Sequence, residues 1–282
     1  MTPDRFAYAA ESWRAFGDVR LALDDRAVLY GDTAFETLRV ERGVALFWRA
    51  HRTRLARSLA LLGFPARARL LGEADAAVAG MPRVENGVLR VTLSRGEGRG
   101  LRRQSVPATY ASLHVIAAQE PPARVRLAVV DAPRAAKSGV FAAKHGNYAF
   151  AAACLARAAA GFDDVAFCAG KERVYETSAG NLFIAKRRVL ATPPADGTIL
   201  AGTTREQVFR LAKKLGFRVV ERAFAVKDVL ACDEAFVTSA IVGFQHVSHF
   251  GKKRLLGDGA VTRALFHAYR GLVEQAIERQ AR

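Results

Sequence analysis

The chain has 282 residues, of which 51% are hydrophobic and 25% are charged. This length can hold one large domain or two medium ones, and the composition is that of an ordinary globular protein. A net charge of +16 raises the question of a polyanionic partner. The basic residues are spread along the whole chain and are not interleaved with aromatic residues, which argues against nucleic-acid binding.

The sequence also lacks the signals of membrane proteins, secreted proteins and metalloproteins. No apolar run approaches the roughly 20 residues that a membrane span needs. Residues 1–16 contain acidic side chains and no apolar core of a signal peptide. The three cysteines lie far apart, without metal-binding spacing. We therefore expect a reduced, cytoplasmic protein that has no metal and no membrane contact.

The first half of the chain shows a hydrophobic pattern of alternating strands and helices. Leu55, Leu59 and Leu62 recur at helical spacing, which predicts an amphipathic helix over 48–62. The other elements expected here are two strands within 27–47 around a turn at 41–43, a helix at about 70–80, and strands at 87–96 and 109–118.

The proline-containing segment 119–124 is the best linker candidate. The elements expected beyond it are strands at 125–132, 163–168, 172–184, 188–192, 217–224 and 233–241, and helices at 147–162, 203–216 and about 259–281. The helix at 203–216 is predicted to begin with a threonine N-cap and to end at a glycine. This order predicts a two-domain α/β (α+β) protein with a small N-terminal domain at 1–118, a linker at 119–124 and a larger C-terminal domain at 125–282.

Two residues combine a reactive side chain with an informative position. Lys144 follows the apolar segment Phe141–Ala143, where partial desolvation would favour the neutral amine that forms a Schiff base. A solvated surface lysine is the simpler explanation. Glu176 stands on the shoulder of a turn between two strands. It could hold a proton on a heterocyclic nitrogen, as pyridoxal phosphate chemistry requires, or it could be a hairpin glutamate paired with an arginine.

The stretch Leu200–Gln207, "LAGTTREQ", has the composition of a phosphate-binding helix start. Gly202 lets the backbone approach closely, and Thr203 and Thr204 bring hydroxyls and amides to the positive end of a helix. An ordinary threonine N-cap would explain the same residues. The stretch Val237–Ala240 offers two further hydroxyls at a strand end.

Taken in order along the chain, seven motifs resemble the class IV aminotransferase family, the fold-type IV pyridoxal phosphate enzymes. They are "YGDTAFETLRV", "HRTRLARSL", "SRGEGRG", "KHGNY", "YETSAGNLFIAK", "LAGTTRE" and "DEAFVTSAIVG". They cover the chain from about residue 20 to 258. Their shared order and spacing make the resemblance highly specific.

The resemblance implies a fold, a cofactor and a set of site residues. It implies pyridoxal 5'-phosphate in a cleft between two domains, and a homodimer whose partner subunit helps to close the site. Lys144 would carry the cofactor as a Schiff base, Glu176 would contact the pyridine nitrogen, and Arg54 would bind the phosphate. The other expected cofactor contacts are Asn181, Thr203, Thr204, Thr238 and Ser239. Tyr148 is also expected to touch the cofactor, because it lies close to Lys144 in the sequence.

Within this family the choice of reaction stays open. Tyr148 stands where many 4-amino-4-deoxychorismate lyases have arginine, which favours an aminotransferase. Its substrates would be a D-amino acid or a branched-chain amino acid and a 2-keto acid. The alternative is a 4-amino-4-deoxychorismate lyase. The substrate would contact Phe35 and the arginines of the loop "SRGEGRG", Arg95 and Arg99. We expect Arg99 to bind the substrate carboxylate. A non-catalytic polyanion-binding relative is a further alternative, against which the retained lysine and glutamate argue.

Overall fold

The computed structural model describes residues 4–100, 106–118, 124–135 and 139–281. Contacts divide the chain into two units. Unit 1 comprises Met1–Ala118, Ala143–Tyr148 and Gln275–Arg282, and unit 2 comprises Gln119–Ala142 and Ala149–Glu274. The expected linker lies almost entirely outside the described residues. The segment that carries Lys144 belongs to unit 1, whereas the sequence-based division assigned it to the C-terminal domain.

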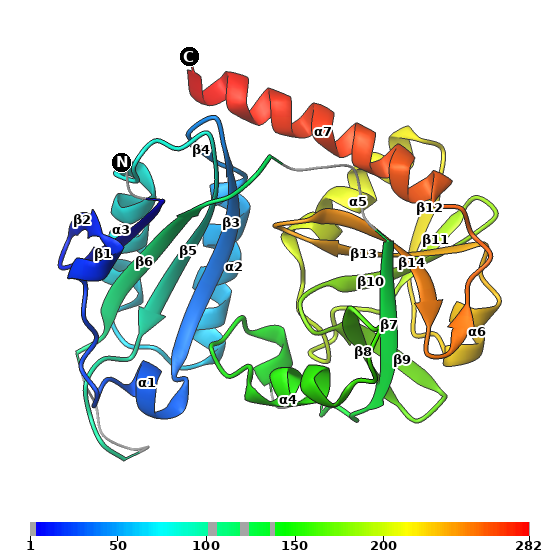
Figure 1. The fold of residues 1–282 in the computed structure, drawn as a ribbon, viewed down its shortest axis with the longest axis horizontal. Helices are drawn as coiled ribbons and strands as arrows, with labels where there is room; N and C mark the ends of the chain where they lie inside the picture. The colour runs from blue at the N-terminus through cyan, green and yellow to red at the C-terminus, as the bar shows by residue number, and fades with distance from the viewer. Residues whose placement is uncertain (1–3, 101–105, 119–123, 136–138, 282) are drawn as a thin grey trace. The chain divides into compact units, whose positions relative to one another are not determined.

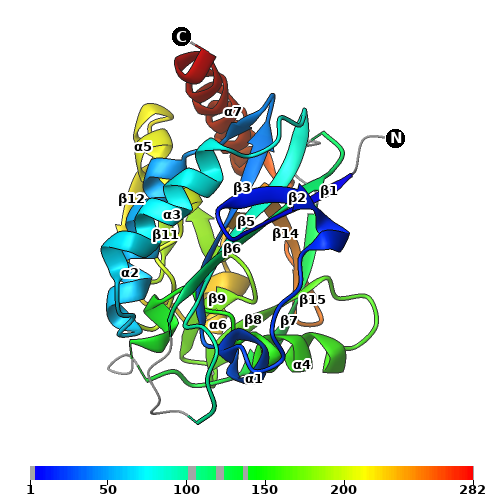
Figure 2. The ribbon, with the colours of Figure 1, turned by 90° about the vertical axis from the view of Figure 1, so that its left-hand side faces the viewer.

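Unit 1 contains, among its described residues, a six-stranded antiparallel sheet in the order β2-β1-β6-β5-β3-β4. Helices α2 and α3 lie along this sheet, as Figure 1 and Figure 2 show. The strands are β1 (Arg5–Ala9), β2 (Ser12–Ala15), β3 (Thr33–Glu41), β4 (Val44–Ala45), β5 (Asn86–Ser94) and β6 (Ala108–Val115). The helices are α1 (Arg26–Tyr30), α2 (Trp48–Leu61) and α3 (Arg67–Ala79), with a 3-10 turn at Phe16–Asp18.

The core of unit 1 lies between the two helices and one face of this sheet. Burial alternates along β5, where Leu89, Val91 and Leu93 are fully buried. They pack in one cluster with Leu55 and Leu59 of α2. Successive strand residues point to opposite faces, so the even-numbered positions of β5 lie on the other face of the sheet, away from the helices.

Unit 2 contains, within its described part, a nine-stranded mixed sheet. Its main path is β12-β11-β10-β13-β14-β7-β8-β9, and β15 pairs with β14. The strands are β7 (Arg124–Asp131), β8 (Asp164–Ala169), β9 (Arg173–Thr177), β10 (Asn181–Lys186), β11 (Val189–Thr192), β12 (Arg218–Glu221), β13 (Glu234–Ser239), β14 (Gly243–Phe250) and β15 (Lys253–Arg254). The helices are α4 (Ala149–Arg157), α5 (Thr203–Lys214), α6 (Val226–Leu230) and α7 (Ala260–Ala281), with a 3-10 turn at Val140–Ala142. The part of α7 from Gln275 onward is grouped with unit 1.

A three-residue connection curls this sheet. Strand β9 ends at Thr177 and β10 begins at Asn181, yet the two strands stand at opposite ends of a six-strand run of the ladder. The sheet must bend back on itself for so short a link to join them. Thr177 and Gly180 close the turn, because the amide of Thr177 donates to the Gly180 carbonyl and the amide of Gly180 donates to the Thr177 hydroxyl.

Several sequence-based boundaries need correction. The expected strand at 172–184 is two strands that pair with different neighbours. The expected strand from residue 27 is helix α1, because the Asp25 side chain accepts a hydrogen bond from the Ala27 amide and caps a helix there. Helix α5 has Gly202, not a threonine, as its N-cap residue. The expected helix at 147–162 is the shorter α4.

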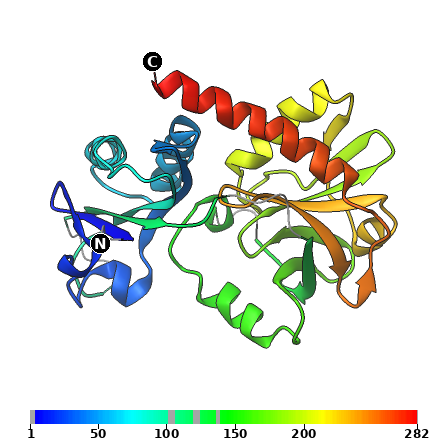
Figure 3. The same ribbon diagram turned by 45° about the horizontal axis from the view of Figure 1, so that its top comes forward.

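The mixed α/β class predicted from the sequence is confirmed, and the described residues form one sheet in each unit. The longest helix is α7, drawn in red in Figure 3. Among the described residues, no helix combines the length and the apolar character that crossing a membrane would require.

Candidate active site

Lys144 is held on the open edge of strand β3. Its neighbour His145 forms an antiparallel bridge with Ala34, and the Lys144 carbonyl accepts a hydrogen bond from the Phe35 amide at 3.1 Å. The Lys144 amide donates to the Ser58 hydroxyl of α2 at 2.9 Å. Both backbone groups of this residue are therefore fixed by a strand and a helix of unit 1.

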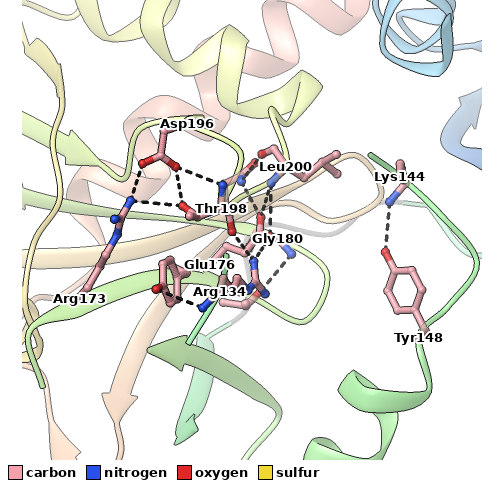
Figure 4. Close-up of polar contacts among 12 residues, drawn as sticks. Arg134, Lys144, Tyr148, Arg173, Glu176, Gly180, Asp196, Thr198 and Leu200 are labelled. Atoms are coloured by element: carbon pink, nitrogen blue, oxygen red, sulfur yellow. Dashed lines mark hydrogen bonds and ion pairs between the residues drawn. The ribbon is translucent and has the colours of Figure 1, made fainter. Parts of the chain in front are cut away.

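The side chain of Lys144 lies beside two aromatic residues. Its Nζ atom is 4.5 Å from the centroid of the Phe35 ring and 3.5 Å from the Tyr148 hydroxyl oxygen, a contact drawn in Figure 4. The Phe35 and Tyr148 rings are also in contact, with centroids 5.8 Å apart. The structure thus brings together three of the residues predicted from the sequence.

Arg54 is part of a buried charge cluster between α2 and β3. Its Nε and Nη2 atoms donate to the two carboxylate oxygens of Glu36 at 2.8 and 2.7 Å. The Nδ1 atom of His51 is 2.7 Å from the same carboxylate. Burial alone would raise the pKa of Glu36, but Arg54 and His51 together lower it from 4.5 to about 2. Burial is also the main reason why the pKa of His51 lies below its ordinary value.

The carboxylate of Glu176, near the end of β9 in unit 2, accepts hydrogen bonds from several donors. Its Oε1 atom accepts from Nη1 of Arg134 at 2.6 Å, and its Oε2 atom accepts from the Asn181 side-chain amide at 3.1 Å. The backbone amide of Leu200 lies 3.2 and 3.3 Å from the two oxygens. Figure 4 shows Arg134 and Leu200 beside this carboxylate. The carboxylate is therefore held in one orientation and keeps its charge compensated.

Arg134 was not identified from the sequence. Besides Glu176, its Nη1 atom contacts the Thr198 carbonyl at 2.8 Å, and its guanidinium lies within 5.5 Å of the ring centroids of Phe141, Phe167 and Tyr175. Arginine is common in this chain, and the partner lies 42 positions away. No local pattern distinguishes Arg134 from a surface arginine.

The start of α5 and the end of β13 form a second polar region in unit 2. Thr203 and Thr204 occupy the first turn of α5 and are buried. The first amides of a helix have no partner within the helix, and they carry a partial positive charge. Thr238 is paired in register with Asn181, and the Asn181 amide donates to the Leu200 carbonyl at 2.8 Å.

The hydroxyl of Thr238 is buried and has no hydrogen-bond partner among the described residues. A buried unsatisfied hydroxyl is costly, so it calls for an acceptor such as a phosphate oxygen. A carboxylate held by donors and a polar helix start both lie in this unit, and together they fit the pyridine nitrogen and the phosphate of pyridoxal phosphate. Ser239 differs, since its hydroxyl already accepts from the Val242 amide at 3.3 Å.

The two loop arginines have different surroundings. Arg95 donates to the Asp32 carboxylate and to the carbonyls of Gly63 and Leu62, at 2.8 to 3.0 Å. These contacts fix the loop to the rest of unit 1. The Arg99 side chain is exposed.

Comparison with known proteins places these features in a family. A family model described as "Amino-transferase class IV" matches residues 33–250. A branched-chain amino acid aminotransferase from Humulus lupulus is 31% identical over 282 aligned residues, with 90% of this chain and 69% of that protein covered. A mitochondrial branched-chain aminotransferase of the same plant is 35% identical over 166 residues, but that match covers only 42% of its own length.

Solved structures show the same fold. A hypothetical aminotransferase from Mycobacterium tuberculosis in its PLP-bound form has a TM-score of 0.78 and 26% identity, with 96% of this chain and 99% of that chain covered. The 4-amino-4-deoxychorismate lyase from Pseudomonas aeruginosa has a TM-score of 0.75 and 22% identity, with 94% and 98% covered.

The match to the family model spans more than half of the chain and includes the segments of Lys144, Glu176 and α5. The resemblance drawn from the motifs is therefore confirmed. The cofactor expected from the sequence is that of the family, pyridoxal 5'-phosphate. The chain belongs to the class IV aminotransferases.

Proposed function

We propose that this protein is an aminotransferase that moves an amino group between an amino acid and a 2-keto acid with pyridoxal 5'-phosphate. The observation that carries the proposal is the Lys144 amine, which is fixed at the edge of β3 with Nζ 3.5 Å from the Tyr148 hydroxyl and 4.5 Å from the Phe35 ring centroid. When bound, the cofactor supplies an electron sink for the bond that breaks at the substrate Cα. Branched-chain amino acids are the first substrates to test, because the plant relatives carry that name.

Lys144 would have two roles in this reaction. Its amine would attach the cofactor covalently. After displacement by the substrate amine, its Nζ atom would remove the proton from the substrate Cα and deliver it to the cofactor carbon that is bonded to the substrate nitrogen. Tyr148 would orient that amine through its hydroxyl. Phe35 would position the amine through the face of its ring, whose centroid lies 4.5 Å from Nζ.

The unit 2 residues would hold the two ends of the cofactor. Glu176 would accept a hydrogen bond from the protonated pyridine nitrogen, with Arg134 and Asn181 keeping its oxygens in place. Thr203, Thr204 and Thr238 would donate to the phosphate, as the buried Thr238 hydroxyl suggests.

For Arg54 we keep the proposal that it binds the phosphate, with Glu36 as the residue that orients it. The bidentate pair fixes the plane of the guanidinium. A fixed plane would hold the guanidinium in one orientation.

The alternative is a 4-amino-4-deoxychorismate lyase, which releases pyruvate, and the likeness to the Pseudomonas aeruginosa enzyme keeps this reaction open at the level of the fold. Absorbance of the purified holoenzyme distinguishes the two. For an aminotransferase, the cofactor band disappears when L-leucine or D-alanine is added and returns with a 2-keto acid. Release of pyruvate from aminodeoxychorismate, without loss of the band, would establish the lyase instead.

We also propose a homodimer, and the exposed helix α4 supports it. Of its nine residues, eight are alanine, phenylalanine, cysteine or leucine, yet none is buried in the single chain. Phe150 is 59% exposed and Leu155 is 37% exposed. One side of α4 packs on the unit 2 core through Ala151 and Cys154. An apolar helix that nevertheless stays this exposed is typical of a surface that a second copy of the chain buries.

A further inference from the structure

Arg90 lies on the same face of the unit 1 sheet as Lys144 and Phe35. In the register of β3 and β5, Arg90 is opposite Thr37 and Phe35 is opposite Thr92, so all four side chains share one face. The antiparallel bridge between Ala34 and His145 places Lys144 opposite Phe35 on that face. This is the face that α2 and α3 do not cover.

Contacts agree with the register. The Cζ atom of Arg90 is 3.5 Å from the Phe35 ring centroid, and Nζ of Lys144 is 4.5 Å from the same centroid. The two cations are therefore separated by no more than the sum of these distances. An α-amino acid has one carbon between its nitrogen and its carboxylate carbon, and a guanidinium holds a carboxylate at about 2.8 Å between nitrogen and oxygen. One amino acid can therefore reach from Lys144 to Arg90.

The charge of Arg90 is uncompensated, unlike that of the buried arginines elsewhere. Nε donates to the Thr92 hydroxyl at 3.3 Å, and no carboxylate of the described residues pairs with the guanidinium. Burial lowers the pKa of Arg90 below its ordinary value, an effect that Tyr148 partly opposes. The buried arginines with carboxylate partners are Arg26 with Asp32, Arg39 with Glu41, Arg54 with Glu36, Arg134 with Glu176, and Arg205 with Glu221.

A half-buried guanidinium without a counterion is costly unless an anion joins it. We propose that Arg90 binds the carboxylate of the amino acid and of the 2-keto acid, in place of the loop residue Arg99. This inference rests on the proposed aminotransferase function and narrows its substrates to carboxylate-bearing amines. Stacking on Phe35 would orient the guanidinium so that its edge meets the carboxylate.

The experiment compares L-leucine with 3-methylbutan-1-amine, which is the same molecule without the carboxylate. The change in cofactor absorbance is measured against the concentration of each compound for wild type, Arg90→Gln and Arg90→Lys. Arg49→Gln serves as the control, because Arg49 is an exposed arginine of α2 in the same unit. D-alanine is run beside L-leucine so that either stereochemistry is covered.

We expect Arg90→Gln to raise the half-saturating concentration of the amino acid about 100-fold, which corresponds to the loss of a charge-assisted pair. The value for 3-methylbutan-1-amine should change less than about threefold. Arg90→Lys should lie between wild type and Arg90→Gln, because an ammonium binds a carboxylate without the planar fork. An unchanged value for the amino acid, or equal changes for both compounds, would overturn the inference.

A second measurement does not depend on turnover. The carboxylic acid 4-methylpentanoate should raise the melting temperature of wild type and of Arg49→Gln, but not that of Arg90→Gln. Without this acid, Arg90→Gln should be at least as stable as wild type, since no ion pair is lost. Equal stabilisation of all three proteins by the acid would refute a carboxylate site at Arg90. A wild-type protein that responds to the acid but converts no amino acid would refute the proposed function while leaving this site in place.

Discussion

Thr238 has a buried hydroxyl that makes no hydrogen bond with any of the described residues. Replacing it with valine keeps the shape and removes the unsatisfied group. We therefore expect Thr238→Val to leave the apoprotein as stable as wild type or to stabilise it by about 1 kcal/mol, and to weaken the retention of pyridoxal phosphate at least tenfold. Chemical denaturation of the apoprotein and equilibrium dialysis of the cofactor check the two effects. A clear loss of apoprotein stability with unchanged cofactor affinity would assign the hydroxyl to the fold.

Arg134 and Glu176 form a nearly buried pair, with side chains 9% and 12% exposed. Removing Arg134 leaves the Glu176 carboxylate without its cation and with little access to water. Arg134→Gln should therefore destabilise the protein by about 3 kcal/mol. The matched control is Arg173→Gln, whose pair with Asp196 has side chains 34% and 38% exposed and should contribute less than about 1 kcal/mol. Urea unfolding measures both. Equal losses would show that the protein does not depend on the Arg134 pair for its stability.

At the scale of elements, α2 is attached to β3 through Glu36, Arg54 and His51. The pKa of Glu36 is depressed from 4.5 to about 2, so the unfolded chain takes up a proton at higher pH than the folded chain. The stabilisation, about 3 kcal/mol, is present above pH 4.5 and is lost as the pH falls towards 2. The pKa of His51 is also lowered in the folded protein, so this histidine contributes stability that is lost as the pH falls below the ordinary pKa of histidine.

Glu36→Gln should be less stable than wild type at pH 7, and the difference should shrink as the pH falls from 4.5 towards 2. Urea denaturation at a series of pH values provides this comparison. A difference that stays constant over this range would mean that the Glu36 carboxylate does not change its ionisation on folding.

The sequence predicted the long elements well, because their hydrophobic periodicity is strong. Leu55 and Leu59 placed α2 almost to the residue, and the glycine stop of α5 was also predicted, with Gly216 at φ 74°. The elements that it missed are short or depend on distant partners. Helix α1 is set by the Asp25 cap. The break in the expected strand 172–184 arises because β9 pairs with the preceding strand β8, whereas β10 pairs with β11 and with the distant strand β13.

The site was predictable only where its residues fall in contiguous motifs. Lys144 and Glu176 stand in such motifs. Arg90 and Arg134 do not stand in such motifs. The strand register places Arg90 beside Phe35, and the fold brings Arg134 to Glu176. A sequence pattern alone cannot supply these long-range contacts.

At the scale of the whole molecule, the proposed dimer makes a prediction about α4. Phe150→Glu adds a charge to an apolar surface, so it should convert the dimer to a monomer, as measured by light scattering at micromolar concentration. Leu256→Glu is the control, because Leu256 is 97% exposed and lies outside any helix or strand. A wild-type protein that already has the mass of a monomer by light scattering would refute the dimer, and a dimeric Phe150→Glu variant would show that the interface lies away from α4.

We propose that Lys144 binds pyridoxal 5'-phosphate covalently. Borohydride reduction of the holoenzyme fixes such a bond, and peptide mass mapping then locates it. We expect one reduced cofactor on the peptide that contains Lys144, and neither a labelled peptide nor the Schiff-base absorbance band in Lys144→Ala. A reduced cofactor on another lysine, or a Lys144→Ala variant with the label and activity of wild type, would show that Lys144 is not the attachment residue.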